Sequence, residues 1–120
     1  MEIRRVLVRD VRDVVLETSE IADAPGPGEI LVETEKTFIS AGTELANFTA
    51  LDPTTRLPGA WNEFPWASGY ANAGRVLATG DSIVGLNPGD RVFTFGKHAS
   101  HHYANLLQRQ WFQIFPVFQD

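Results

Sequence analysis

The chain has 120 residues, of which 43% are hydrophobic and 21% charged, and it carries a formal net charge of −5 and no cysteine. This length and balance are typical of one globular domain and argue against disorder, while the acidic charge and scattered basic residues argue against a nucleic-acid-binding surface. Without cysteine, the chain has no disulfide, no thiolate nucleophile and no cysteine-ligated zinc.

The N-terminal stretch gives no indication of targeting. It reads "MEIRRVLVRD" and alternates charged and apolar residues too quickly for a signal peptide. No apolar run approaches the ~20 residues of a membrane-spanning helix. We therefore expect a cytoplasmic protein that forms one domain over residues 1–120 and does not bind membranes.

The first part of the chain shows the period of two that indicates β-strands. Residues 2–9 and 11–18 are rich in β-branched side chains interleaved with charged ones, which predicts a first pair of strands. A turn follows at "PGPG", and from Glu29 a third strand is predicted with one face in water. Its apolar face is expected to carry Ile30, Val32 and Phe38.

The middle of the chain changes character. The stretch "SAGTELANFTA" predicts a short helix, with Thr43 as its N-cap and Glu44 in its first turn, where an acid suits the helix dipole. Residues 51–66 contain three prolines that interrupt backbone hydrogen bonding, so we expect a long ordered loop. Trp61 and Trp66 of this loop either line a small-molecule pocket or pin the loop to the rest of the domain.

The second half returns to strands. Residues 73–79 and 91–95 are predicted strands, and "NPGD" at 87–90 places Pro and Gly at the central positions of a tight turn between them. The stretch "HASHHYAN" continues extended, and strong β formers surround Pro116 near the end. These elements predict a mainly β domain, a barrel or a sandwich, with one short helix.

Several stretches, taken in order, resemble the N-terminal catalytic domain of the medium-chain dehydrogenase/reductase superfamily, the zinc-type alcohol dehydrogenase and quinone reductase group. They are "PGPGEILVE", "ISAGTEL", "SGYANAGRV", "VGLNPGDRVFTFG" and "HASHHYAN". Their order and spacing carry the resemblance, since each alone could occur by chance. The resemblance implies a GroES-like, partly open β-barrel with one or two short helices.

Two positions depart from the zinc-dependent members of this superfamily. Their Cys-Gly-Thr-Asp stretch falls on residues 41–44 and their Gly-His-Glu-x-x-Gly stretch on residues 69–74, so the metal-holding Cys and His are replaced by Ala41 and Tyr70. The cysteine-rich lobe of the structural zinc is also missing. The resemblance therefore points to a zinc-free branch, and we predict no metal site.

The same resemblance suggests catalytic roles for two hydroxyl groups. Tyr70 stands at a ligand position, where a phenol could donate a hydrogen bond to a carbonyl oxygen as hydride arrives. Thr43 occupies the position of a proton-relay hydroxyl. The alternative for Tyr70 is an aromatic at the rim with its hydroxyl in water, and Glu44 could either act near the substrate or simply favour the helix start.

The histidines of "HASHH" suggest a metal site, but a strand does not bring them together. On a strand His98 and His102 point one way and His101 the other, so at most two converge. No acid follows them before Asp120. We expect these histidines to face solvent or to line the cleft, and we include His98 with Glu44, Trp61 and Trp66 among the candidate substrate-binding residues.

The superfamily's cofactor site has no counterpart in this sequence. In relatives NAD(P)H is held by a Rossmann domain after the barrel, and such a site needs a glycine-rich turn between strand and helix. No G-x-G-x-x-G occurs here. We expect a chain inactive by itself, either a truncated relative of a zinc-independent NAD(P)-dependent reductase or a free-standing, non-catalytic binding or assembly module.

The C-terminal segment "WFQIFPVFQD" is rich in aromatic residues. It either completes the barrel as a last core strand or covers the face where a Rossmann domain would sit. In the second case it could pair with another copy of the chain, since apolar patches of this size mark interfaces. We predict a homodimer through this segment.

Overall fold

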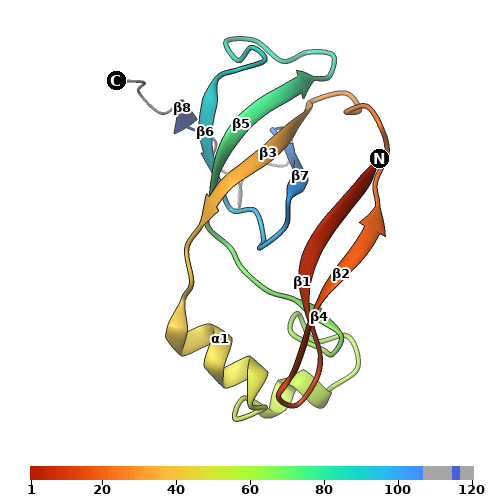
Figure 1. The fold of residues 1–120 in the computed structure, drawn as a ribbon, viewed down its shortest axis with the longest axis vertical. Helices are drawn as coiled ribbons and strands as arrows, with labels where there is room; N and C mark the ends of the chain where they lie inside the picture. Colours follow the sequence, from red (N-terminus) through yellow and green to blue (C-terminus); the bar gives the residue numbers. More distant parts are fainter. Residues whose placement is uncertain (107–114, 117–120) are drawn as a thin grey trace.

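Two antiparallel sheets form the domain, and one helix extends from their junction (Figure 1). The computed structural model describes residues 1–106 and 115–116. The smaller sheet has the order β2-β1-β4 and the larger one β7-β3-β5-β6-β8. The elements are β1 Glu2–Asp10, β2 Asp13–Glu20, β3 Glu29–Thr37, α1 Ala41–Phe48, β4 Trp66–Ala67, β5 Asn72–Thr79, β6 Arg91–Thr94, β7 His101–Asn105 and β8 Phe115–Pro116, with a 3₁₀ helix at Pro53–Arg56. Over the described residues this is the mainly β, partly open GroES-like architecture that the sequence predicted, without a closed barrel.

The hairpin of β1 and β2 is two residues longer than predicted. Its strands pair from Glu2 with Glu20 to Asp10 with Asp13, so Val11 lies in the turn and not in the second strand. The Asp10 carboxylate accepts a hydrogen bond from the Val11 backbone N–H, and Arg12 takes a left-handed backbone with φ of 56°. These local preferences, which strand periodicity does not reveal, set the turn.

The larger sheet holds the core. Five fully or nearly fully buried side chains pack together there: Ile30, Val32, Val76, Val92 and Ala104. The third strand does not alternate as predicted, because its register shifts by one residue after Leu31 and again after Thr34. The placement of Phe38 on its apolar face is wrong, since the strand ends at Thr37 and Phe38 is 63% exposed.

The N-cap of helix α1 lies three residues before the predicted one. It is Ser40, not Thr43, and Thr43 lies inside the helix. The Glu44 carboxylate accepts a hydrogen bond of 2.7 Å from the Ser40 backbone N–H through Oε2, much as the acid of a capping box does but from one residue further along the helix. This bond also orients the other carboxylate oxygen of Glu44.

The loop between α1 and β4 is ordered, as predicted, and it is held by buried amides. Asn62 is fully buried and donates hydrogen bonds through Nδ2 to Asn47 Oδ1 at 2.7 Å and to Asp52 Oδ2 at 3.3 Å. Buried polar groups are stabilising only when they are paired in this way. The network fixes the path of the loop and so the position of Trp66, which opens β4.

Strands β5 and β6 and their connection follow the prediction closely. The turn at 87–90 is closed by a hydrogen bond of 3.1 Å from the Asp90 backbone N–H to the Asn87 carbonyl. At the other edge of β6, the short β8 pairs with it. The rest of the predicted aromatic C-terminal segment, residues 107–114 and 117–120, lies outside the described residues. No helix in the described part of the chain is long and apolar enough to cross a membrane.

Candidate functional site

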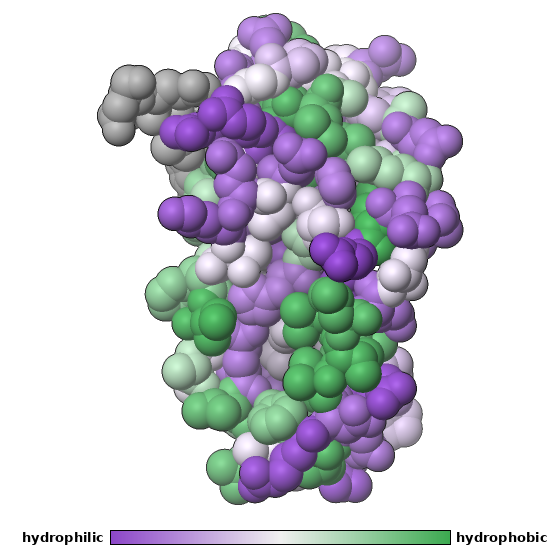
Figure 2. All heavy atoms as spheres, in the orientation of Figure 1, coloured by the Kyte–Doolittle hydropathy of each residue, from purple (hydrophilic) through white to green (hydrophobic). Residues whose placement is uncertain are grey.

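A cavity of about 620 Å³ lies between α1 and the hairpin of β1 and β2. Figure 2 shows hydrophobic side chains gathered on both sides of the hollow between these elements. Its apolar lining consists of Val6, Val8, Val14, Ile39, Ala41, Leu45, Phe48 and Trp66, and its polar lining of Thr37, Glu44, Ser68 and His98. Such an apolar cleft with a few converging polar groups is the usual form of a small-molecule site.

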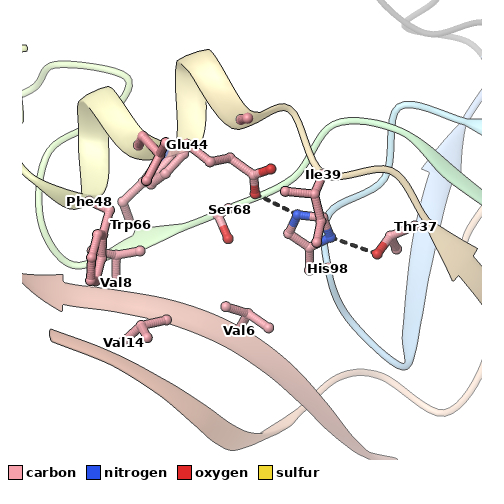
Figure 3. Close-up of a pocket in the computed structure, with 12 residues that line it drawn as sticks. Val6, Val8, Val14, Thr37, Ile39, Glu44, Phe48, Trp66, Ser68 and His98 are labelled. Atoms are coloured by element: carbon pink, nitrogen blue, oxygen red, sulfur yellow. Dashed lines mark hydrogen bonds and ion pairs between the residues drawn. The ribbon is translucent and has the colours of Figure 1, made fainter. Parts of the chain in front are cut away.

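Three of the four polar side chains of this cavity, Thr37, His98 and Glu44, form a hydrogen-bonded chain centred on His98 (Figure 3). The His98 Nε2 atom lies 2.5 Å from Glu44 Oε1, and its Nδ1 atom lies 2.7 Å from Thr37 Oγ1. Both side chains of the His98–Glu44 pair are mostly buried, at 11% and 15% exposed. An ionised carboxylate can only accept, so His98 Nε2 donates to Glu44. Nδ1 then accepts from the Thr37 hydroxyl when the ring is neutral and donates to it when the ring is protonated.

Backbone hydrogen bonds to β1 and to the residue after β4 hold His98 in place. Its N–H donates to the Ser68 carbonyl and its carbonyl accepts from the Val6 N–H, each at 2.9 Å. Two residues later, Ser100 is bonded to β1 and β3, since its N–H donates to Arg4 at 2.7 Å and its carbonyl accepts from Thr34 at 2.8 Å. The segment 98–100 is therefore a bridge between the two sheets.

Gly69 makes the close approach of His98 possible. Its φ of +100° is a conformation that residues with a side chain rarely adopt. A Cβ at this position would lie 2.6 Å from the His98 backbone nitrogen and 2.9 Å from ring atoms of the imidazole. The absence of a side chain at Gly69 therefore leaves room for the backbone and ring of His98.

The structure brings three of the six predicted site residues into the cavity wall: Glu44, Trp66 and His98. Trp61 is 68% exposed and packs edge-on against Trp66, with ring centroids 5.9 Å apart. Trp61 therefore supports the wall without belonging to it.

The two hydroxyl groups predicted to be catalytic lie elsewhere. Tyr70 is 45% exposed in the connection between β4 and β5, and Thr43 is partly buried within α1. Neither is among the residues that line this cavity. Their catalytic roles remain predictions.

Thr37 and the valines of β1 were missed by the sequence reasoning. No local pattern links Thr37 to His98, because the two residues are 61 positions apart and meet only through the pairing of the sheets. In the sequence, the valines look like ordinary core residues of a strand. Only the three-dimensional arrangement shows that Val6 and Val8 face a cavity.

The described residues do not fit the zinc ion of the superfamily. Ala41 offers a methyl group to the cavity, and Tyr70 lies outside its lining. In the part of the chain that the structure describes, no group of three or more His, Asp or Glu side chains is placed to hold a metal ion. The strand geometry expected for the histidines was wrong for His98, which precedes β7, and His101 and His102 have other partners.

The fold resembles that of the N-terminal GroES-like domain of the medium-chain dehydrogenase/reductase superfamily. The quinone oxidoreductase of Pseudomonas syringae pv. tomato DC3000 superposes with a TM-score of 0.65 at 22% identity, over 97% of this chain and 34% of that protein. A protein of Sinorhizobium meliloti 1021 solved with NADP bound gives 0.67 at 18% identity, over 100% of this chain and 40% of that one. The family resemblance seen in the sequence is confirmed.

Among characterised proteins, the chain is 36% identical over 98 residues to the 2-desacetyl-2-hydroxyethyl bacteriochlorophyllide A dehydrogenase of Cereibacter sphaeroides. The match covers 82% of this chain and 29% of that enzyme. No protein-family model matches the sequence. The chain therefore spans about a third of the length of its oxidoreductase relatives, and in this superfamily NAD(P) is bound by the Rossmann domain.

Proposed function

We propose that the chain forms the substrate side of a zinc-independent, NAD(P)-dependent oxidoreductase that interconverts an alcohol and a carbonyl compound or reduces an activated alkene. The observation that carries this proposal is the hydrogen-bonded chain of Thr37, His98 and Glu44 in the wall of an apolar cleft. The apolar lining fits a largely apolar substrate. The relative from Cereibacter sphaeroides is named as a dehydrogenase of a hydroxyethyl compound, which supports the alcohol and carbonyl pair.

The nicotinamide cofactor, when bound by the Rossmann domain, supplies or takes up a hydride at the substrate carbon. Negative charge then develops on the substrate oxygen, and a pre-placed donor stabilises it. The Thr37 hydroxyl is such a donor, and His98 in its protonated form replaces the proton through Nδ1. Glu44 stabilises the resulting positive ring because its carboxylate accepts from Nε2.

The position of Ala41 favours zinc independence. A metal ion in this cleft would polarise the substrate oxygen, but the described side chains around it offer the imidazole of His98 and the carboxylate of Glu44, which are bonded to each other. The Thr37–His98–Glu44 chain would then take over the stabilisation of the oxygen. Because the cofactor is held by another domain in the family, we expect no turnover from residues 1–120 alone.

A non-catalytic binding or dimerising module is the second candidate. The exposed apolar side chains at the edge of the cleft favour it, Ile39 above all at 71% exposed. A pairing through the aromatic C-terminal segment also remains a proposal, as does the cytoplasmic location. Saturation transfer to the nicotinamide protons of NADPH separates the candidates, since a non-catalytic module shows none at millimolar cofactor.

Filling the cleft is expected to abolish binding of an apolar substrate. In Ala41→Trp the indole would project into the cavity, so trans-cinnamaldehyde, an apolar enal, should bind at least about tenfold more weakly than to the wild type. Amide shifts in two-dimensional NMR spectra of the chain measure this binding and should map to the cavity wall. The matched control is Val84→Trp, which adds the same side chain at a fully exposed position and should bind normally.

Two outcomes would contradict the proposed site. Equal binding of cinnamaldehyde to the Ala41→Trp variant and the wild type would show that the probe does not occupy this cleft. Stoichiometric zinc in the purified protein, measured by elemental analysis, would overturn the zinc-independent mechanism while leaving the cleft as the substrate site.

A further inference from the structure

A second cavity, of about 280 Å³, lies on the opposite side of the wall that forms the first. The side chains of a strand alternate between its two faces, and here each face serves a different cavity. On β1, Val6 and Val8 line the first cavity, whereas Ile3 and Arg5 line the second. The segments after it repeat the pattern: Trp66, Ser68 and His98 line the first cavity, and Ala67, Lys97 and Ala99 the second.

The lining of the second cavity includes two basic side chains and no acidic one. Its walls contain Lys97 and Arg5, together with His101 and His102, and no Asp or Glu is among its lining residues. His101 lies 3.6 Å from Glu33 outside the lining. Arg5 is paired with Glu17 at 2.8 Å. The Lys97 ammonium donates to the Ala67 carbonyl at 2.9 Å, and within the described residues no carboxylate forms an ion pair with it. Burial lowers the pKa of Lys97, because the charged form is poorly solvated there.

His102 has a ring nitrogen without a partner. Its Nε2 atom lies 2.7 Å from the Thr94 hydroxyl oxygen, which also accepts from the Gly96 N–H at 3.0 Å, and either side chain can donate in the Thr94–His102 bond. The Nδ1 atom is buried, and the described part of the chain provides no partner for it. When Nδ1 carries the ring proton, an acceptor oxygen of a ligand would satisfy it.

The rest of the cavity lining is apolar. Ile3, Ile21 and Phe95 contribute the larger side chains. A ligand that matches both parts of the lining carries a negative charge at one end and an apolar body at the other. An inorganic anion would leave the apolar walls uncovered, and a neutral apolar compound would leave the ammonium without a partner.

We propose that this second cavity binds a small carboxylate with an aromatic or branched apolar body. The carboxylate pairs with the Lys97 ammonium, and the body packs against Phe95, Ile3 and Ile21. The site is separate from the substrate cleft, and it does not depend on the proposed oxidoreductase activity.

Benzoate is the probe that tests this site, with benzamide as its neutral counterpart of the same shape. Titrations followed by amide shifts in two-dimensional NMR spectra should show saturable benzoate binding, with the affected amides at residues 67, 97 and 102. Lys97→Met, which keeps the length of the side chain and removes its charge, should weaken benzoate binding at least about tenfold, the typical effect of losing one charge-assisted contact. Lys97→Arg should retain most of the affinity.

Three outcomes would overturn the proposal. These are equal binding of benzoate and benzamide, unchanged benzoate binding in Lys97→Met, or shifts that map to the His98 cleft instead of the second cavity. Inorganic phosphate that binds as tightly as benzoate would also contradict the proposal, because the apolar lining would then contribute nothing to the affinity. Because Lys97 is partly exposed and does not belong to the hydrophobic core cluster, both variants should fold, and the dispersion of their spectra checks this.

Discussion

Replacing Gly74 with alanine is expected to lower the free energy of unfolding by ~3 kcal/mol. Gly74 lies in β5 opposite Thr34 of β3. A Cβ there would lie 2.2 Å from the Glu33 carbonyl oxygen and 2.7 Å from Val32 Cγ1. These atoms belong to β3, an inner strand of the larger sheet that pairs on both sides, so the backbone has little freedom to move away. Urea denaturation followed by tryptophan fluorescence measures the loss.

The matched control is Gly42→Ala in α1. A Cβ on Gly42 meets nothing within 4 Å, and alanine favours a helix over glycine by up to ~1 kcal/mol. We therefore expect this variant to be as stable as the wild type or slightly more stable. If the two substitutions cost the same, the close packing of β3 and β5 around Gly74 would not be a source of stability.

Acid is expected to destabilise the protein through His102 by about 3 kcal/mol in all. Burial, with a smaller contribution from the charge of His101, lowers the pKa of His102 to about 4 from the ordinary 6.5. The unfolded chain therefore binds a proton at this residue at higher pH than the folded one does. The contribution is fully present above pH 6.5 and is lost as the pH falls from 6.5 to about 4. Urea unfolding measured at intervals across this window follows the loss.

A His102→Gln variant tests the assignment. Glutamine does not titrate, and its side-chain oxygen can still accept from the Thr94 hydroxyl. The free energy of unfolding should then vary much less with pH above about 4. Hydrogen bonds lower the pKa values of the Asp23 and Asp52 carboxylates. Their contributions to the free energy of unfolding are therefore lost only at more acidic pH. An unchanged slope in the variant would show that other groups cause the loss.

The strands and turns of this domain could be predicted because their signals are local. Alternation located β5 and β6, and the Pro-Gly pair located the turn at 87–90. Predictions from the local sequence were wrong where contacts between residues in the folded chain determine the structure. Strand β3 ends at Thr37 and leaves Phe38 exposed, and the hydrogen bond of the Glu44 carboxylate places the helix cap at Ser40 instead of Thr43.

The site was less predictable because it joins segments far apart in the chain. Glu44 and His98 were both candidates from the sequence, but nothing in it placed them 2.5 Å apart, since 54 positions separate them. The resemblance to the family directed attention to Tyr70, the residue that replaces a metal ligand. The polar groups of the cleft instead come from a helix turn and from the segment before β7, which only the packing of the two sheets brings together.

The bridge formed by residues 98–100 has a mechanical consequence. It hydrogen-bonds to β1 in the smaller sheet and to β3 in the larger one, and His98 lies at its start. The two sheets cannot rotate relative to each other without stretching these hydrogen bonds. The orientation of the His98 imidazole in the cleft therefore depends on the angle between the sheets. Any force that a neighbouring domain exerts on one sheet is thereby transmitted to the ring itself.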